Sequence, residues 1–373
     1  MVNWNEIRKA FPVCDKYIYL NSAGGSPLSS NAYQESRRFY DEMLEWGDIP
    51  YDNWIKQTEE VRNKIAATIG AERKEIAFVP NTSTGMAYIA NMLKGMGEVL
   101  TMEDEFPSTT LPWLNLDHTV AFVRPENHQY SPERIEKAIT PRTRILLTSY
   151  VQYRTGFRQD IEAVGKLCAE RGLLFVVNAT QALPVFPVDV KKDHVDFLVF
   201  TGLKWAGSGY GSGILFIGKD WLDTLKFPVA GWRSVDHPEY MDNASTTIRN
   251  ESSALEGGCP SFSTVFALGG AIDLFNSIGR DNVTKRILHL SGYLDRKLRA
   301  SGFTVFSPGE EKHRSSIVMI KTDNAKAIAD ELFAKKIFVT ARGQGLRVSV
   351  HVFNNESDLD VFANELNKLK AML

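Results

Sequence analysis

The sequence predicts a protein of the α/β class, in which a large, mostly parallel β-sheet domain is followed by a smaller α+β domain. Its 373 residues are too many for one ordinary domain and enough to build two sizeable hydrophobic cores. From about residue 76 onward, segments of strand and helix character alternate, which is typical of a parallel sheet whose strands are joined by crossing helices. After about residue 245 this alternation ends.

The chain opens with an N-terminal segment, residues 1–25, that we expect to pack with the small domain. Its short extended piece at 17–20 leads into a loop rich in glycine and serine. Helices are predicted at 29–46 and 52–69, and Gly70 supplies the stop signal of the second.

The large domain is predicted to cover residues 26–245. Its strands are expected at 76–79, 145–151, 173–177, 197–200 and 214–217. The strand at 173–177 is continuously apolar, as a strand covered on both faces should be. Asp160 and Gly172 provide the start and stop signals of the helix before it.

Residues 246–373 are predicted to form the small domain. Helices are expected at 263–278, 281–300, 324–335 and 357–373, and strands at 303–306, 316–321 and 346–350. The last helix carries leucine and phenylalanine along one face, as an amphipathic helix does.

Composition and charge exclude several classes of function. The 43 lysine and arginine residues nearly balance 45 acidic residues, so the net charge of −2 predicts neither a nucleic-acid partner nor a membrane surface. The three cysteines are scattered, which argues against disulfides or a zinc site, and the dispersed histidines argue against a metal centre. No signal-peptide pattern or membrane-length apolar run is present, so we expect a cytoplasmic protein.

The stretch from Asp196 to Gly213 is the first candidate for chemistry. An apolar strand ends at Thr201, Lys204 follows, and glycines stand at 207, 209, 211 and 213. A lysine just past a buried strand can lose its proton and attack carbonyl groups as a neutral amine. Taken alone, the stretch also fits an ordinary glycine-rich turn with a solvated lysine.

Three further segments carry polar groups where a ligand could bind. Thr82 and Ser83 lie between a strand and a helix, where hydroxyls and free N–H groups bind phosphate, although a plain helix cap needs the same residues. Asn178 and Gln181 follow a buried strand, where ligands of parallel sheets bind. Arg347, on a predicted strand, could grip a carboxylate with two N–H groups or could be an exposed edge-strand arginine.

Together, in this order and at these intervals, the four sites resemble the class V aminotransferases. This family of fold-type I pyridoxal-phosphate enzymes also contains cysteine desulfurases, kynureninases and isopenicillin N epimerase. The resemblance runs nearly end to end, from Tyr19-Leu20-Asn21 to the segment that ends at Asn354. It implies a large sheet of the seven-stranded type, pyridoxal 5′-phosphate as the cofactor, and a homodimer with shared active sites.

The resemblance also assigns roles to individual residues. Lys204 matches the lysine that forms a Schiff base with the cofactor and later moves the substrate α-proton. Thr82, Ser83 and Thr201 match the residues that bind the cofactor phosphate. Phe106 matches the aromatic residue stacked on the cofactor ring, and Gln181 matches the residue that hydrogen-bonds the phenolic oxygen. Arg347 and Asn21 match substrate-binding residues. Gly258 and Cys259 match the segment that each subunit sends into its neighbour's site.

Three positions depart from the family pattern. Asn178 stands where an aspartate usually faces the pyridine nitrogen, so we hypothesise that this nitrogen is less protonated here and that carbanions are less stabilised. Leu203 replaces the histidine that precedes the lysine in desulfurases, and Cys259 replaces a threonine whose hydroxyl reaches the partner's phosphate. A desulfurase would also need a cysteine between Ile337 and Gln344, and none is present.

The resemblance therefore predicts an aminotransferase-like enzyme that acts on a small α-amino acid through Lys204, with transamination as the default. The alternatives are a racemase, an epimerase or a lyase without the catalytic cysteine, and a protein that binds the cofactor but turns over little. A dehydrogenase of the Rossmann type is disfavoured, because the glycine spacing does not match and no acidic residue is suitably placed.

Overall fold

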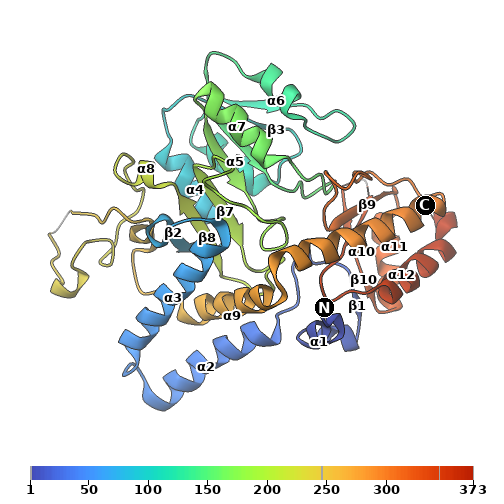
Figure 1. Ribbon diagram of the computed structural model, residues 1–373, viewed down its shortest axis with the longest axis horizontal. Helices are drawn as coiled ribbons and strands as arrows, with labels where there is room; N and C mark the ends of the chain where they lie inside the picture. Colours follow the sequence, from blue (N-terminus) through green and yellow to red (C-terminus); the bar gives the residue numbers. More distant parts are fainter. Residues whose placement is uncertain (1, 245–246, 344, 373) are drawn as a thin grey trace.

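A seven-stranded β-sheet forms the centre of the molecule, in a computed structural model that describes residues 2–244, 247–343 and 345–372. The strand order is β2-β8-β7-β6-β5-β3-β4 (Figure 1). From β7 to β4 all neighbours are parallel, and β8 is antiparallel to both β7 and β2. This confirms the predicted α/β fold. The strands are β2 (Ile76–Val79), β3 (Glu98–Met102), β4 (Val120–Val123), β5 (Thr143–Ser149), β6 (Leu174–Asn178), β7 (Phe197–Thr201) and β8 (Gly213–Ile217).

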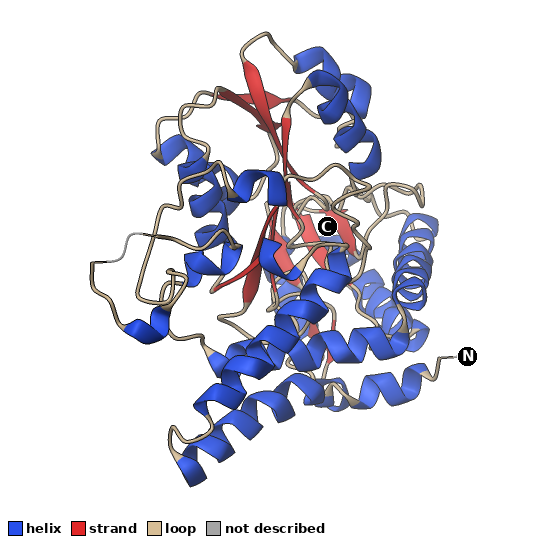
Figure 2. Cartoon of the chain, turned by 60° about the vertical axis from the view of Figure 1, so that its left-hand side comes forward, coloured by secondary structure: helices blue, strands red, loops and turns tan. Residues whose placement is uncertain are grey.

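Helices cover both faces of this sheet, which Figure 2 shows as red strands between blue helices. Alternate residues of one strand belong to different core clusters: Val176 packs in one and Val177 in the other. The Val176 cluster includes residues of α4 (Thr82–Met92) and α5 (Pro107–Asn115), whereas the Val177 cluster includes residues of α7 (Ile161–Arg171) and α9 (Phe262–Ile278). Because both faces are covered, β3, β6, β7 and β8 are buried along their whole length.

Helix α9 packs against two long N-terminal helices, α2 (Ser30–Trp46) and α3 (Tyr51–Ile69). The contact is aromatic: the ring of Trp54 lies 4.9 Å from that of Phe39 and 5.5 Å from that of Phe262. Most residues of α9 are buried, which explains its high hydrophobicity. In the described parts of the chain no single helix is long and apolar enough to cross a membrane; α9 and α10 (Arg280–Ala300) meet that criterion only as a pair bent by 82°.

The C-terminal part contains a three-stranded antiparallel sheet of order β11-β12-β9. Its strands are β9 (Ile317–Lys321), β11 (Thr340–Arg342) and β12 (Gly345–Ser349), and its other helices are α11 (Ala325–Ala334) and α12 (Glu356–Lys368). The strand expected at 303–306 forms only a single bridge, between Val305 and Ile320, so that prediction was wrong. The remaining helices of the described chain, apart from short 3₁₀ turns, are α1 (Trp4–Lys9), α6 (Pro132–Ala138) and α8 (Lys219–Leu222).

The N-terminal segment lies against this C-terminal part (Figure 1). Strand β1 (Ile18–Tyr19) pairs in parallel with β10 (Ile337–Phe338), and Arg8 forms an ion pair with Asp358 at 2.7 Å. The division into units 1–25, 26–245 and 246–373 stays a prediction, and its boundary at 245–246 lies outside the described residues.

Candidate active site

A cavity of about 240 Å³ opens where three parallel strands of the large sheet end. Ser149, Asn178 and Thr201 are the last residues of β5, β6 and β7, and all three line it. Strand β12 of the smaller sheet contributes Arg347 from the other side. Carboxyl ends of parallel strands are the usual ligand-binding edge of such a sheet. The cavity therefore brings together residues more than 250 positions apart in the chain.

Lys204 lies in the wall of this cavity, three residues beyond the end of β7. Its Nζ atom is 5.6 Å from the centre of the Phe106 ring, which also lines the cavity. Burial lowers the pKa of the Lys204 amine to about 7, and the positive charges of Arg347 and Arg342 act in the same direction. An amine with this pKa has a substantial neutral fraction at physiological pH, and that fraction is nucleophilic.

The N-terminus of α4 borders the cavity close to this lysine. Helix α4 begins at Thr82 because Asn81 caps it, with its side chain accepting the N–H of Thr84 at 2.9 Å. The first N–H groups of a helix have no intrahelical partner, and together with the helix dipole they favour a bound phosphate. Two hydroxyl pairs flank this terminus: Thr82 contacts Thr180 at 2.6 Å and Ser83 donates to Ser108 at 2.7 Å.

Gln181 is held in a single orientation by two hydrogen bonds. Its oxygen accepts the Trp205 indole N–H at 3.0 Å, and its nitrogen donates to the Ala23 carbonyl at 3.0 Å. An indole N–H can only donate, so the amide nitrogen must be the atom that faces Ala23. The second hydrogen of this nitrogen is left for a ligand in the cavity that Gln181 lines.

Arg347 presents an open fork of N–H groups. Its side chain is buried, and Nη1 donates to the carbonyl of Tyr153 at 3.2 Å. Nε and Nη2, which form the opposite edge of the guanidinium, have no hydrogen-bond partner among the described residues. Burial and the nearby Arg342 lower the pKa of Arg347 to about 10, so it remains a cation at neutral pH. Two adjacent unpaired N–H groups on a buried cation match the geometry of a carboxylate.

Three residues expected in the site do not line this cavity. Asn21 packs against Gly24, which does line the cavity: a Cβ atom added to Gly24 would be 2.8 Å from the amide nitrogen of Asn21. Cys259 instead borders a separate hollow beside Gly211 and Phe78. A Cβ atom on Gly258 would meet nothing within 4 Å.

Sequence reasoning missed several residues of the cavity wall. Tyr153 and Ser108 lie in loops and helix ends that carry no motif of their own, and Arg342 is a lone arginine on a three-residue strand. Thr180 lies between Asn178 and Gln181, so its position in the same turn could have indicated it. The complete lining is Ala23, Gly24, Asn81, Thr82, Ser83, Phe106, Ser108, Ser149, Tyr153, Asn178, Thr180, Gln181, Thr201, Leu203, Lys204, Tyr210, Arg342 and Arg347.

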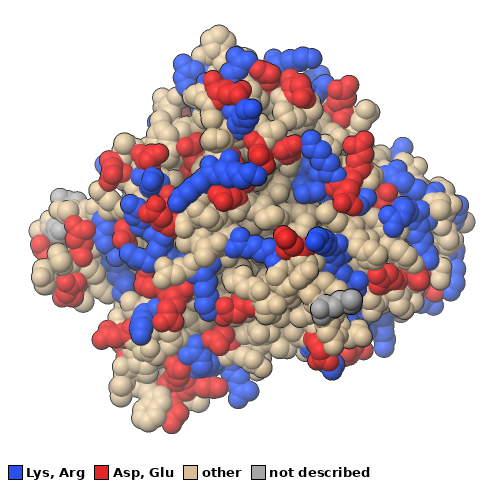
Figure 3. All heavy atoms as spheres, in the orientation of Figure 1, with Lys and Arg blue, Asp and Glu red and all other residues tan. Residues whose placement is uncertain are grey.

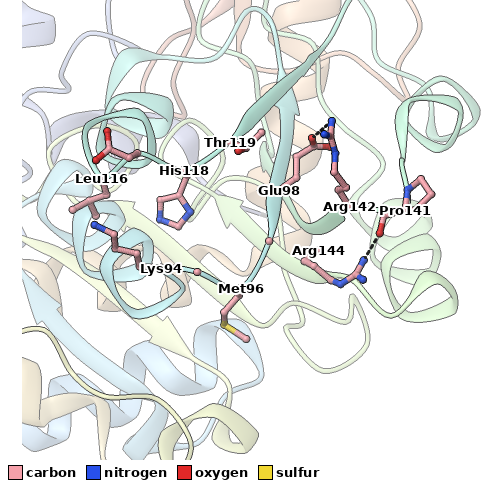
Figure 4. Close-up of a pocket in the computed structure, with 12 residues that line it drawn as sticks. Lys94, Met96, Glu98, Leu116, His118, Thr119, Pro141, Arg142 and Arg144 are labelled. Carbon is pink, nitrogen blue, oxygen red and sulfur yellow. Dashed lines mark hydrogen bonds and ion pairs between the residues drawn. The ribbon is translucent and has the colours of Figure 1, made fainter.

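A larger hollow of about 700 Å³ lies at the opposite edge of the sheet, where β3, β4 and β5 begin (Figure 4). Its two arginines are engaged by the protein itself: Arg142 pairs with Glu98 at 3.3 Å and Arg144 donates to the Pro141 carbonyl at 2.9 Å. Positive and negative side chains are also mixed over the face of the molecule shown in Figure 3. The Lys204 cavity is therefore the better candidate for chemistry.

The groups around Lys204 fit a phosphorylated pyridine aldehyde. The helix terminus and hydroxyls suit its phosphate, Phe106 suits a flat ring, and Lys204 suits the aldehyde carbon. Arg347, with two unpaired N–H groups, is left for the carboxylate of a substrate.

The model of the aminotransferase class-V family matches residues 18–362. The chain is 26% identical over 360 residues to the uncharacterised aminotransferase YcbU of Bacillus subtilis (strain 168), with 95% of each chain covered. It is also 26% identical over 414 residues to a probable cysteine desulfurase of Halalkalibacterium halodurans, covering 99% of this chain and 98% of that one.

Solved structures show the same fold. The apo structure of the cysteine desulfurase from Thermococcus onnurineus NA1 superimposes with a TM-score of 0.92 at 22% identity, and the match covers 100% of this chain and 99% of that one. A structure of the enzyme C-DES, with glycine covalently linked to its pyridoxal-phosphate cofactor, superimposes with a TM-score of 0.89 at 20% identity over 96% and 98% of the two chains. The chain therefore belongs to the aminotransferase class-V family, whose members use pyridoxal phosphate.

Proposed function

We propose that this protein is a pyridoxal-phosphate enzyme that acts on a small α-amino acid, with transamination as its default reaction. The observation that carries the proposal is the pairing, in one cavity, of a lysine whose pKa is lowered to about 7 with an arginine whose two free N–H groups form an open fork. The first group suits an aldehyde cofactor and the second suits an amino-acid carboxylate.

Each cofactor contact is assigned to residues of the cavity wall. Thr82, Ser83 and the N-terminus of α4 would hold the phosphate, with Thr201 beside them. The Thr201 hydroxyl donates to the Ser212 carbonyl at 3.1 Å, so it must turn to donate to a phosphate oxygen. Gln181 would donate its remaining N–H to the phenolic oxygen, and Phe106 would pack against the ring.

Lys204 would hold the cofactor and then move the proton at the substrate α-carbon, while Arg347 orients the substrate by its carboxylate. When bound, pyridoxal phosphate supplies an electron-withdrawing ring that stabilises negative charge at that carbon. The neutral state of the Lys204 amine near pH 7 allows it to accept this proton.

A lyase or racemase is the second candidate, and Asn178 favours it because a weaker electron sink changes how intermediates partition. Desulfuration through a cysteine is disfavoured, because no cysteine stands between Ile337 and Gln344, where the resemblance places the reactive thiol of a desulfurase. Burial raises the pKa of Cys14 to about 12 and raises that of Cys168, so neither is a ready thiolate. A homodimer with shared sites is part of the proposal, since Gly258 and Cys259 have no place in their own subunit's cavity.

Incubation with each common amino acid tests the proposal, with keto acid, inverted amino acid and released fragments analysed together. Keto acid supports transamination, whereas inverted amino acid or released fragments support the second candidate. A visible absorbance band that no amino acid shifts would indicate a protein that binds the cofactor without turnover. Absence of any such band would contradict the proposal altogether.

A further inference from the structure

The orientation of the Asn178 side chain is determined by the protein. Its oxygen accepts the backbone N–H of Thr180 at 3.0 Å. A backbone N–H can only donate, so the atom that it contacts must be the amide oxygen. The amide nitrogen is therefore the other atom, and it donates to the Thr109 hydroxyl at 2.8 Å.

Thr109 accepts this hydrogen bond because its own hydrogen is used elsewhere. Its hydroxyl is one of the donors to the carboxyl group of Glu105, which is buried. That carboxyl also receives the Ser149 backbone N–H at 2.6 Å and the Gln152 amide at 2.8 Å. Burial raises the pKa of Glu105, and these hydrogen bonds oppose the rise. Glu105 thus acts as an acceptor: Asn178 donates to Thr109, and Thr109 donates to Glu105.

One hydrogen of the Asn178 amide is left over. Its nitrogen carries two hydrogens and gives one to Thr109, and within residues 2–244, 247–343 and 345–372 the second has no protein acceptor. Asn178 lines the Lys204 cavity. Asn178 therefore keeps one free N–H, while its oxygen, which already accepts the Thr180 N–H, keeps one lone pair.

We propose that Thr109, itself held by Glu105, is a positioning residue that acts with the Thr180 N–H to turn the free N–H of Asn178 toward the cofactor ring, so that this protein binds the ring with its nitrogen unprotonated. The inference rests on the proposed function, since it concerns the ring of pyridoxal phosphate. A protonated ring nitrogen is itself a donor and would face the Asn178 N–H without an acceptor between them. A carboxylate at this position would instead accept the nitrogen's proton and stabilise its positive charge.

The test is a nitrogen-15 NMR spectrum of the holoenzyme, reconstituted with pyridoxal phosphate that is labelled at the ring nitrogen. The free cofactor, recorded with and without its ring proton, provides the two reference shifts. The native protein should show the unprotonated shift, and Asn178→Asp should show the protonated one. Thr109→Ser keeps the hydroxyl and should match the native spectrum, whereas Thr109→Val should change the shift and weaken cofactor binding by about tenfold, the loss expected for one hydrogen bond.

A protonated shift in the native protein at neutral pH would overturn the inference while leaving the proposed function intact. A Thr109→Val protein with the native shift and native affinity would show that Thr109 and Glu105 do not position Asn178. The native spectrum decides the protonation state of the ring nitrogen even if Thr109→Val fails to fold. In that case the nitrogen-15 shifts of Thr109→Ser and Glu105→Leu are compared to decide whether Thr109 and Glu105 position Asn178. A native protein that takes up no cofactor would overturn both the inference and the proposed function.

Discussion

The Arg347→Met variant should lose substrate binding without losing stability. Arg347 is only 2% exposed, and two of its three guanidinium nitrogens have no partner among the described residues. A buried charge with unpaired N–H groups destabilises the empty protein, and an apolar side chain of similar length removes that cost. The change also removes one hydrogen bond, to the Tyr153 carbonyl. We therefore expect an unfolding midpoint equal to or above that of the native protein.

The loss of function follows from the fork itself. Two charge-assisted hydrogen bonds contribute about 1.5 kcal/mol each, so their removal should cost about 3 kcal/mol in transition-state binding. That corresponds to a decrease of about 150-fold in kcat/KM. The matched variant Arg347→Lys keeps the charge but cannot make the two-pronged contact, so a decrease of about tenfold is expected.

The assay combines thermal unfolding of each variant with kcat/KM on the amino acid found in the substrate panel. Without turnover, the dissociation constant from the amino-acid-induced shift of the cofactor absorbance takes the place of kcat/KM. The reasoning would be refuted by a methionine variant that melts well below the native protein and keeps its kcat/KM. That result would mean that Arg347 stabilises the fold and does not contact the substrate.

Three further predictions concern Lys204, Phe106 and the proposed dimer contact at Gly258. Because burial lowers the pKa of Lys204 to about 7, the rate at which apoenzyme takes up pyridoxal phosphate should rise as the pH increases through about 7 and then level off; a rate still rising toward the ordinary value of 10.5 would contradict this. Phe106→Leu removes the aromatic face and should weaken cofactor binding about fivefold, for a loss of about 1 kcal/mol, while Phe106→Tyr should bind normally; equal affinities in a cofactor titration would exclude ring packing. Gly258→Phe should fold, because a Cβ atom there meets nothing within 4 Å. It should nevertheless disrupt the proposed dimer and lower the cofactor content relative to Gly258→Ala. If sedimentation shows an intact dimer with a full cofactor content, Gly258 does not lie in the interface.

The sheet strands that the sequence predicted well are those with continuous apolar runs. Strands β6, β7 and β8 are buried on both faces, so nearly every residue in them is apolar and the signal is strong. Strands β3 and β4 were missed, because β3 begins at a charged Glu98 that the fold satisfies with Thr140 and Thr143, and β4 is partly exposed near the sheet edge. The expected strand at 303–306 has only one bridging partner, which no local pattern could reveal.

The sequence by itself determined the family and the chemical types of its candidate site residues. Lys204 follows the end of a strand, Thr82 begins a helix and Arg347 lies on a strand. The residues next to each of them set these local patterns. Their order and intervals carried the resemblance, and the family match over residues 18–362 agrees with it.

Only the tertiary structure decided which atoms of these residues are available. Folding removes the Lys204 amine from water and brings it near Arg347 and Arg342, and both effects lower its pKa. It also ties Nη1 of Arg347 to the Tyr153 carbonyl and leaves Nε and Nη2 without a partner among the described residues. It also turns the Asn178 nitrogen to Thr109. Hydrogen bonds and desolvation depend on partners that lie far away in sequence, and their directions are set when the ends of separate strands meet at one edge of the sheet.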